Sequence, residues 1–194
     1  MRPNLTPTPP GGAESDAAWS ASIRFLHWVV ATLIFTQFAL GWLAVGWRLS
    51  PTKINLFVWH KSVGILILAL VLIRLLNRLT KPTPALPPDT PAWERIAARW
   101  SHALLYVLMI AMPLTGWVIN SAAGIPFRIF WQVPLPALMA PDKHTADIAA
   151  LVHFALGVAL AGLLMLHIGA ALRHHFVKRN SVLIRMLRAR RTGS

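Results

Sequence analysis

Residues 148–172 read IAALVHFALGVALAGLLMLHIGAAL, and this stretch decides how the rest of the sequence is interpreted. It is long and apolar enough to cross a bilayer as a helix, which requires about 20 apolar residues. It also carries His153 and His167, and ionisable side chains inside a membrane are rare and usually functional. The stretch therefore predicts a membrane helix that brings two histidines to a functional site.

The composition of the whole chain agrees with a membrane protein. Of its 194 residues 56% are apolar and only 13% are charged, against roughly 25% charged residues in an average soluble domain. So much apolar surface needs lipid to cover it, which excludes an ordinary soluble enzyme. The chain has no cysteine, which excludes disulfides, thiolate metal sites and covalent CxxCH haem attachment. Metal chemistry must therefore use histidine, methionine or carboxylates.

Three further stretches have the length of a membrane span: 24–46, 55–76 and 99–120. Backbone polar groups in lipid must be satisfied within the segment, so these stretches should be helices. Barrel strands would alternate apolar and polar residues, and these segments do not. We predict an all-α membrane protein built as a four-transmembrane-helix bundle.

The remaining segments divide the chain. Residues 1–22 are predicted to be a disordered cytoplasmic tail without the apolar region of a signal peptide. Residues 23–180 form the transmembrane domain, and 181–194 form a basic cytoplasmic tail. Within the domain, the proline-rich stretch 81–91 is predicted to be a stiff linker, and the apolar but broken stretch 121–146 an interfacial cap on the outer end.

The distribution of positive charge predicts the orientation. Lys and Arg number 19 against 6 Asp and Glu, a net charge of +13. Most of these cations flank the termini and the connection between the second and third spans, which places both termini in the cytoplasm. A basic C-terminus beside a membrane is explained by anionic lipid, so we expect no nucleic acid partner. The cations on the opposite, outer side are Arg48, Lys53, Lys61, Arg128 and Lys143.

The histidines fall at two depths. His153 and His167 are 14 residues apart, which puts them on one helix face, about 40° off register and ~21 Å apart. Across the bundle His60 matches the depth of His153, near the outer ends of their spans. His27 matches the depth of His167, near the inner ends. The spacing predicts two bis-histidine sites stacked through the membrane.

Two imidazoles at each depth favour haem over other metals. Zinc usually needs four protein ligands and copper prefers further donors, whereas haem needs only one or two axial ligands. A non-haem transporter or channel whose histidines relay protons is the alternative from another class. His102 shares the inner depth and could replace His27, or could bind a haem propionate or water.

Three histidines stay outside this scheme. His144, in the outer connection, is either exposed or serves a substrate, whereas His174 and His175 are expected at the membrane interface.

At these residues the sequence resembles the bacterial cytochrome b561 family, which is related to the haem subunits of formate dehydrogenases and nickel–iron hydrogenases. The resemblance covers most of residues 24–190. The pieces that carry it are RFLHW (24–28), WHKSVG (59–64), RLLNR with KPTP (74–84), HALLY (102–106), PLTGW (113–117), and the stretch from His153 through His167 to HHF (174–176).

The resemblance implies a four-helix bundle with a haem at each end. It implies two haem b groups, ligated by His27 and His167 on the inner side and by His60 and His153 on the outer side. The inner cations Arg24, Arg74 and Arg78 would pair with haem propionates, unless they only anchor the chain by positive charge.

The resemblance also implies a location and an activity. The chain would lie in the bacterial inner membrane, contact lipid and exchange electrons with ubiquinone. Some members resemble superoxide:ubiquinone oxidoreductases, so the donor would be superoxide or a periplasmic redox protein. The alternative within the family is a haem-bearing anchor subunit of a periplasmic dehydrogenase or hydrogenase. The basic patch that would attract superoxide, or else is ordinary loop charge, consists of Lys53, Lys61, Arg128 and Lys143.

Overall fold

The computed structural model describes residues 19–81 and 90–187. Its long helices are α1 (Ala21–Gly46), α2 (Pro51–Thr80), α3 (Ala92–Ala122) and α4 (Lys143–Phe176). All four are long and apolar enough to cross a membrane, so the prediction of an all-α, four-transmembrane-helix bundle is confirmed. Most of tail 1–22, linker 81–91 and the end of tail 181–194 lie outside the described residues, and the division into these segments stays a prediction.

The long helices begin earlier than the apolar pattern predicts, and in α2 and α4 a polar residue caps the start of the helix. Ser50 accepts the backbone N–H of Lys53 at 3.4 Å before α2, and Pro51 occupies the first turn, where its missing N–H costs nothing. Asp142 caps α4 by accepting the hydroxyl and the backbone N–H of Thr145. These hydrogen bonds hold the pKa of the Asp142 carboxyl below its usual range.

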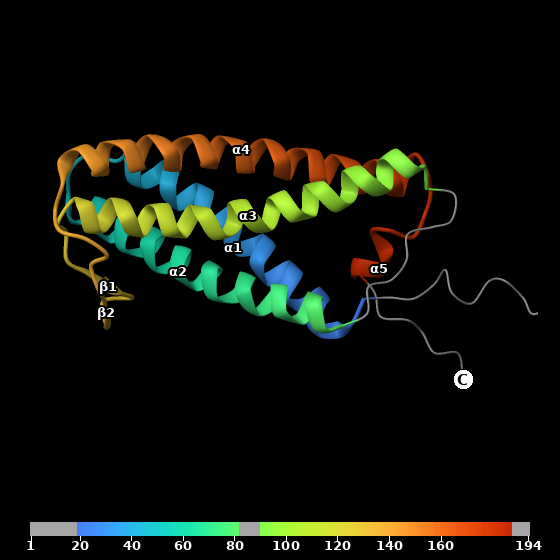
Figure 1. Cartoon of the computed structure of the whole chain (residues 1–194), viewed down its shortest axis with the longest axis horizontal. Coiled ribbons are helices and arrows are strands. Elements are labelled where there is room, and N and C mark those ends of the chain that lie inside the picture. Colours follow the sequence, from blue (N-terminus) through green and yellow to red (C-terminus); the bar gives the residue numbers. More distant parts are fainter. Residues whose placement is uncertain (1–18, 82–89, 188–194) are drawn as a thin grey trace, which may run out of the picture.

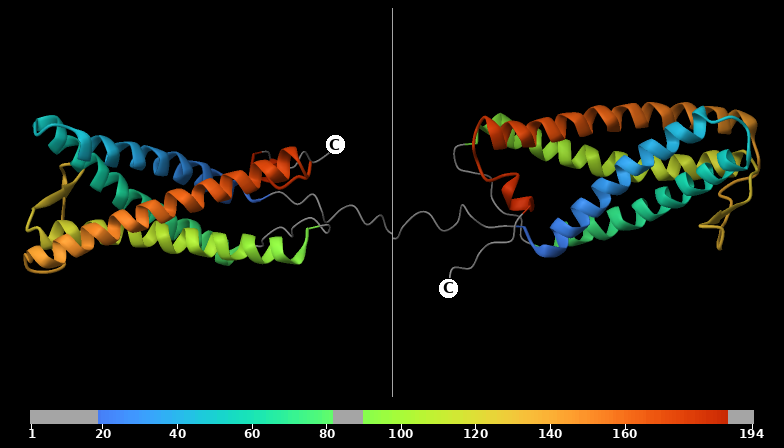
Figure 2. Two further views of the ribbon diagram at one scale, coloured as in Figure 1. Left: turned by 90° about the horizontal axis from the view of Figure 1, so that it is seen from above. Right: turned by 180° about the vertical axis from the view of Figure 1, so that it is seen from behind.

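The bundle is made of two hairpins. Helix α1 packs mainly on α2, α3 packs on α4, and the α2–α3 contact joins the two pairs. Figure 1 shows the helices running along one axis, with the short hairpin β1–β2 at one end and α5 (Ile184–Leu187) at the other. We call the hairpin end the outer end and the α5 end the inner end, and both views in Figure 2 keep them apart.

Helix α4 contributes little to the apolar core. Its only buried residues are Ala149 and Leu160, although its window of highest hydropathy is the most apolar of the four. The buried residues that form the main core are Val30, Ile34, Val63, Ile67, Val71, Leu105, Tyr106, Leu108, Met109 and Leu160. The fully buried core residues therefore come mainly from α1, α2 and α3, whereas α4 packs on α3 and adds the partly buried Leu156, Leu163 and Leu164.

The outer connection is more regular than its broken sequence suggests. Strands β1 (Phe127–Ile129) and β2 (Val133–Leu135) pair antiparallel, with Phe127 opposite Leu135. Phe130 and Trp131, in the turn, have φ values of 47° and 62°, a left-handed conformation that bulky residues rarely adopt. The backbone N–H of Phe130 donates to Ser62 Oγ at 2.8 Å. This bond fastens the hairpin to α2 at the outer end.

Candidate functional site

The four histidines predicted to act together form two facing pairs inside the bundle. At the outer end the rings of His60 and His153 have centroids 6.3 Å apart. At the inner end the centroids of His27 and His167 are also 6.3 Å apart. Helix α4 supplies one ring to each pair, while α1 and α2 supply the partners.

The hydrogen bonds around His153 define its tautomer. The Thr115 hydroxyl donates to the backbone carbonyl of Met112 at 2.9 Å, and the same oxygen lies 2.9 Å from His153 Nδ1. Since the hydroxyl hydrogen is already used, Thr115 accepts from His153 Nδ1–H. Nε2 of a neutral His153 is then free of hydrogen, as a metal ligand requires.

At the inner pair the hydrogen bond to Nδ1 runs in the opposite direction. Arg74 Nη2 lies 2.9 Å from His27 Nδ1, and a guanidinium can only donate, so this Nδ1 accepts. Arg74 is only 8% exposed and its Nε is buried without a partner, as is Nε of Arg24. Within the described residues neither guanidinium forms a salt bridge. A buried charge needs compensation, so the buried Arg74, together with the half-buried Arg24, favours an anion at the inner end.

Two more side chains belong to the inner end. The Arg74 guanidinium lies over the ring of Tyr106, 5.5 Å from its centroid, and the Tyr106 hydroxyl is buried without a partner. His102 Nδ1 is 2.6 Å from the backbone carbonyl of Ala98 and must donate to it. The centroid of this ring lies 5.2 Å from that of His167.

These distances can be compared with what an axially ligated metal needs. Imidazole nitrogens bind first-row metals at about 2 Å, which separates the centroids of two facing rings by about 6 Å. Both predicted pairs meet this condition, whereas the His102–His167 separation is shorter. In the described part of the chain, no group of three or more His, Cys, Asp or Glu could hold a metal. Paired histidines near buried cations therefore suit haem, because the porphyrin supplies the other ligands and carries carboxylates.

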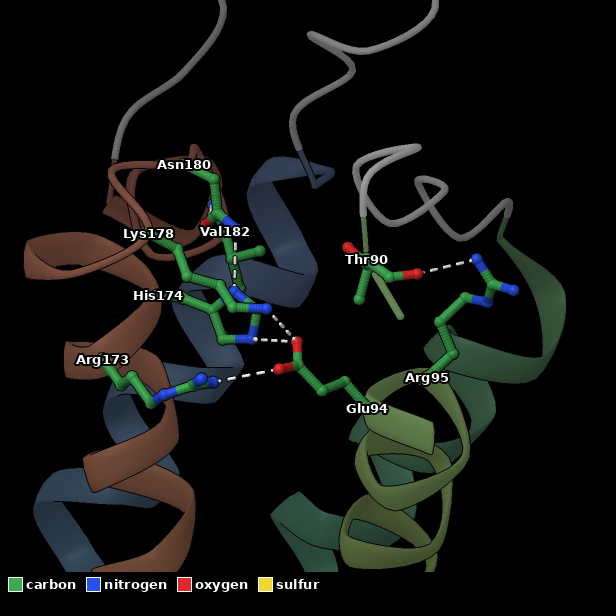
Figure 3. Close-up of polar contacts among 8 residues, drawn as sticks. All are labelled: Thr90, Glu94, Arg95, Arg173, His174, Lys178, Asn180 and Val182. Atoms are coloured by element: carbon green, nitrogen blue, oxygen red, sulfur yellow. Dashed lines mark hydrogen bonds and ion pairs between the residues drawn. The ribbon is translucent and has the colours of Figure 1, made fainter. Parts of the chain in front are cut away.

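A buried ion cluster ties α3 to α4 at the inner end, as Figure 3 shows. Glu94 is only 7% exposed. Its carboxylate accepts from Arg173 at 3.0 Å and from Lys178 at 2.5 Å, and His174 Nε2 lies 3.6 Å away. The segment that follows continues into α5, where the Met186 carbonyl accepts from the Trp28 indole at 3.0 Å.

The predicted outer cations do not form one cluster. The ammonium of Lys53 donates to the carbonyls of Val45 and Trp47, and Arg128 donates to the carbonyl of Gln132.

The other two cations of the predicted basic patch, Lys61 and Lys143, differ in burial. Exposed Lys143 pairs with Asp147 at 2.6 Å. Half-buried Lys61 donates to Asn120 Oδ1 at 2.6 Å, 5.5 Å from the centroid of the Phe127 ring. Of the four cations in this patch, Lys61 directly follows His60 in the sequence.

The other predicted residues make different contacts. Arg78 lies over the Trp19 ring, 5.7 Å from its centroid. His144 is exposed in the first turn of α4. His174 Nδ1 lies 2.8 Å from the side-chain nitrogen of Asn180, and the His175 ring packs edge-on against Phe176.

Two residues at the site escaped prediction from sequence. Thr115 lies in a stretch quoted for the family resemblance, but its bond to His153 depends on how α3 and α4 pack. The sequence could have predicted ion pairs for Glu94, because it is an isolated carboxylate in a strongly basic inner region. Its burial depends on α4 continuing as far as Phe176.

Facing imidazoles inside membrane-spanning helices define the class of a haem-binding membrane protein. Residues 18–189 match the family described as prokaryotic cytochrome b561. The chain belongs to this family, as the resemblance implied. It is a membrane protein that binds b-type haem and transfers electrons in the membrane.

Three curated relatives match the chain over most of its length and of their own. The chain is 35% identical over 167 residues to cytochrome b561 homolog 2 of Escherichia coli, covering 83% of this chain and 86% of the relative. It is 26% identical over 171 residues to cytochrome b561 homolog 1 of the same organism, covering 86% and 95%. It is 29% identical over 169 residues to the probable superoxide oxidase CybB of Yersinia pestis, covering 86% and 93%.

Proposed function

We propose that the protein is a diheme cytochrome of the bacterial inner membrane, with His60 and His153 ligating an outer haem b and His27 and His167 an inner one. It carries electrons between a periplasmic donor and the quinone pool, with both termini in the cytoplasm. In its most specific form the reaction is oxidation of superoxide with reduction of ubiquinone. The observation that carries the proposal is the pair of facing histidine sites, each with ring centroids 6.3 Å apart.

The haems supply one-electron redox chemistry, and the protein supplies ligation, positioning and charge. Arg24 and Arg74 are suited to hold the inner propionates, because each has a buried Nε without a partner. If His27 ligates through Nε2, Arg74 must release Nδ1, and a propionate would draw it away. Arg78 is the third candidate for this role.

Superoxide as donor is supported by charge at the outer end. Five cations lie there against two carboxylates, Asp142 and Asp147, and a basic surface attracts an anionic radical. Lys61 is the strongest candidate, since Asn120 holds its ammonium in place one residue after His60. Lys53, Arg128 and Lys143 contribute at longer range. One relative is itself described as a probable superoxide oxidase.

Ubiquinone as acceptor is supported by an aromatic cluster near the outer pair. The rings of Phe130 and Trp131 lie 5.6 and 5.4 Å from the ring of Trp59, which directly precedes His60. The left-handed turn presents both aromatic side chains against α2, and such conformations persist where a site needs them. A flat quinone ring can stack on this surface.

The overall reaction balances in electrons and protons. Two superoxide anions each lose one electron and leave as dioxygen. One ubiquinone gains both electrons and two protons and leaves as ubiquinol.

The test is anaerobic mixing of the purified full-length protein with superoxide, with and without ubiquinone, while the haem absorption bands are recorded. The proposal expects two haems per chain, fast appearance of the ferrous bands, and their decay when ubiquinone is added. Two haems that superoxide does not reduce would remove the specific activity and leave a diheme cytochrome with another donor. A colourless protein would contradict the proposal as a whole.

A further inference from the structure

Gln37, on α1, contacts the outer pair through the backbone of His60. Its side-chain nitrogen donates to the His60 carbonyl at 2.8 Å. Only the NH2 arm of the amide can donate to a carbonyl, so the other arm carries the oxygen Oε1. That oxygen is buried and has no hydrogen-bond partner among the described residues.

His60 carries the complementary atom. Its ring Nδ1 is buried and forms no hydrogen bond of normal geometry, although the backbone carbonyl of Gln37 interacts with the same ring. In contrast, Nδ1 of His27, of His102 and of His153 each has a hydrogen-bond partner. An unpaired buried donor or acceptor is costly, and a metal-ligating histidine usually gives its second ring N–H to an acceptor. One α1–α2 contact thus holds an unpaired acceptor and an unpaired donor.

Two glycines allow this close approach. A Cβ at Gly41 would lie 3.0 Å from Cε1 and 3.3 Å from Nδ1 of His60. A Cβ at Gly64 would lie 3.2 Å from Nε2 of Gln37. Side chains at either position would push the imidazole or the amide aside, so the space is shaped for these two groups.

We propose that Gln37 is a positioning residue for the outer haem, its Oε1 accepting from His60 Nδ1–H directly or through one water. The bond fixes the orientation of the ring and makes Nε2 a more basic ligand. A more basic ligand favours ferric over ferrous iron and lowers the midpoint potential. This inference rests on the proposed function, in which His60 ligates the outer haem.

The experiment is a redox titration of the purified full-length protein carrying Gln37→Leu, with haem content measured in parallel. The net contribution of a hydrogen bond corresponds to about a twofold to tenfold change in an equilibrium constant. The ferrous-to-ferric ratio of one haem should rise by that factor at fixed ambient potential, and tenfold equals about 59 mV for one electron. The ferric EPR signal of the same haem should shift, while the second haem stays unchanged.

Two further variants show whether the change in potential comes from the groups around the outer pair. Thr36→Val changes the residue before Gln37, whose hydroxyl bonds only to the Thr32 carbonyl of its own helix, and should shift neither haem. Thr115→Val removes the Nδ1 partner of His153, the opposite ligand of the same haem. It should shift the same haem as Gln37→Leu.

Unchanged potentials and EPR signals in a Gln37→Leu protein with full haem content would overturn the inference. If that variant loses the outer haem, two milder variants replace it in the redox titration and the EPR measurement. Gln37→Asn shortens the side chain by one methylene, and Gly64→Ala crowds the amide. Unchanged potentials and EPR signals in both would overturn the inference. Failure of the proposed function looks different. Two haems that do not react with superoxide would leave this inference standing, whereas a wild-type protein without an outer haem would overturn both.

Discussion

The outer and inner histidine pairs have the same ring separation but different surroundings. At the outer end the ring of His153 meets the neutral hydroxyl of Thr115, and the neutral amide of Gln37 donates to the backbone carbonyl of His60. At the inner end His27 meets the guanidinium of Arg74, and Nε of the half-buried Arg24 is also buried without a partner. The difference teaches that the two sites are not copies. The outer pair is surrounded by neutral hydrogen-bonding groups, whereas the inner pair lies beside positive charge that would suit an anionic partner such as the proposed haem propionates.

The largest expected effect comes from breaking one pair at a time. His153→Ala should remove the outer haem and His167→Ala the inner one, each leaving about half of the haem. A haemochrome assay and the spectra of the two variants measure this. His144→Ala, also on α4 but exposed, is the control and should keep both haems. Loss of both haems from either single variant would show that the pairs do not ligate independently.

The second effect decides between two inner ligands. His27→Ala should lose the inner haem and His102→Ala should keep it, because the His27–His167 separation suits a ligated metal and the His102–His167 separation is shorter. Haem content and low-spin ferric EPR signals report the result. The reverse outcome would make His102 the ligand and leave His27 as the partner of Arg74.

The third effect concerns the outer end alone. Lys61→Gln should lower the second-order rate of reduction by superoxide by roughly tenfold and weaken its salt dependence, with both potentials little changed. Stopped-flow mixing at several ionic strengths gives the rates. Lys143→Gln is the comparison, since Lys143 is exposed and already paired with Asp147. Equal effects of the two variants would mean that overall charge, and not the position of Lys61, governs the encounter.

The fourth effect concerns the inner end alone. Arg74→Leu removes a buried cation beside His27, which should favour ferric iron and lower the inner potential by roughly 60 mV. Arg74→Lys should keep part of the effect by retaining the charge. A redox titration resolves the two haems, and the outer potential should not move. A shift of the outer haem would contradict the assignment of Arg74 to the inner site.

The smallest expected effect concerns the ion cluster around Glu94 at the inner end. Glu94→Gln weakens the contacts to Arg173 and Lys178 and should lower the Tm of the haem-loaded protein by roughly 2–4 °C. Asp147→Asn breaks an exposed pair and should leave the Tm unchanged. A thermal scan of the Soret band measures both. If the two variants behave alike, burial adds nothing to the Glu94 cluster.

The sequence was sufficient for the spans and for the depth of each histidine, because both follow from counting residues along helices. It also predicted which histidines lie opposite one another, since few ionisable residues lie at each depth, and the structure brings these rings together; their role as ligands stays a prediction. It could not identify the groups around each ring. Thr115 and Gln37 reach their histidines only because of the rotation of α3 and α1 about their axes, which apolar periodicity leaves undefined. The sequence did not predict the outer hairpin either, because Phe130 and Trp131 occupy left-handed turn positions where glycine is expected.

The shallow packing of α4 has a consequence for how the protein is made. Among the four long helices it is the last along the chain, it has only Ala149 and Leu160 fully buried, and it carries one histidine of each facing pair. In the proposed diheme protein, cofactor delivery would therefore add to the attachment that α4 already has through α3 and the Glu94 cluster. In cells short of haem, newly made chains would hold a loosely joined final segment that membrane proteases can recognise, so the supply of porphyrin would set the abundance of the protein.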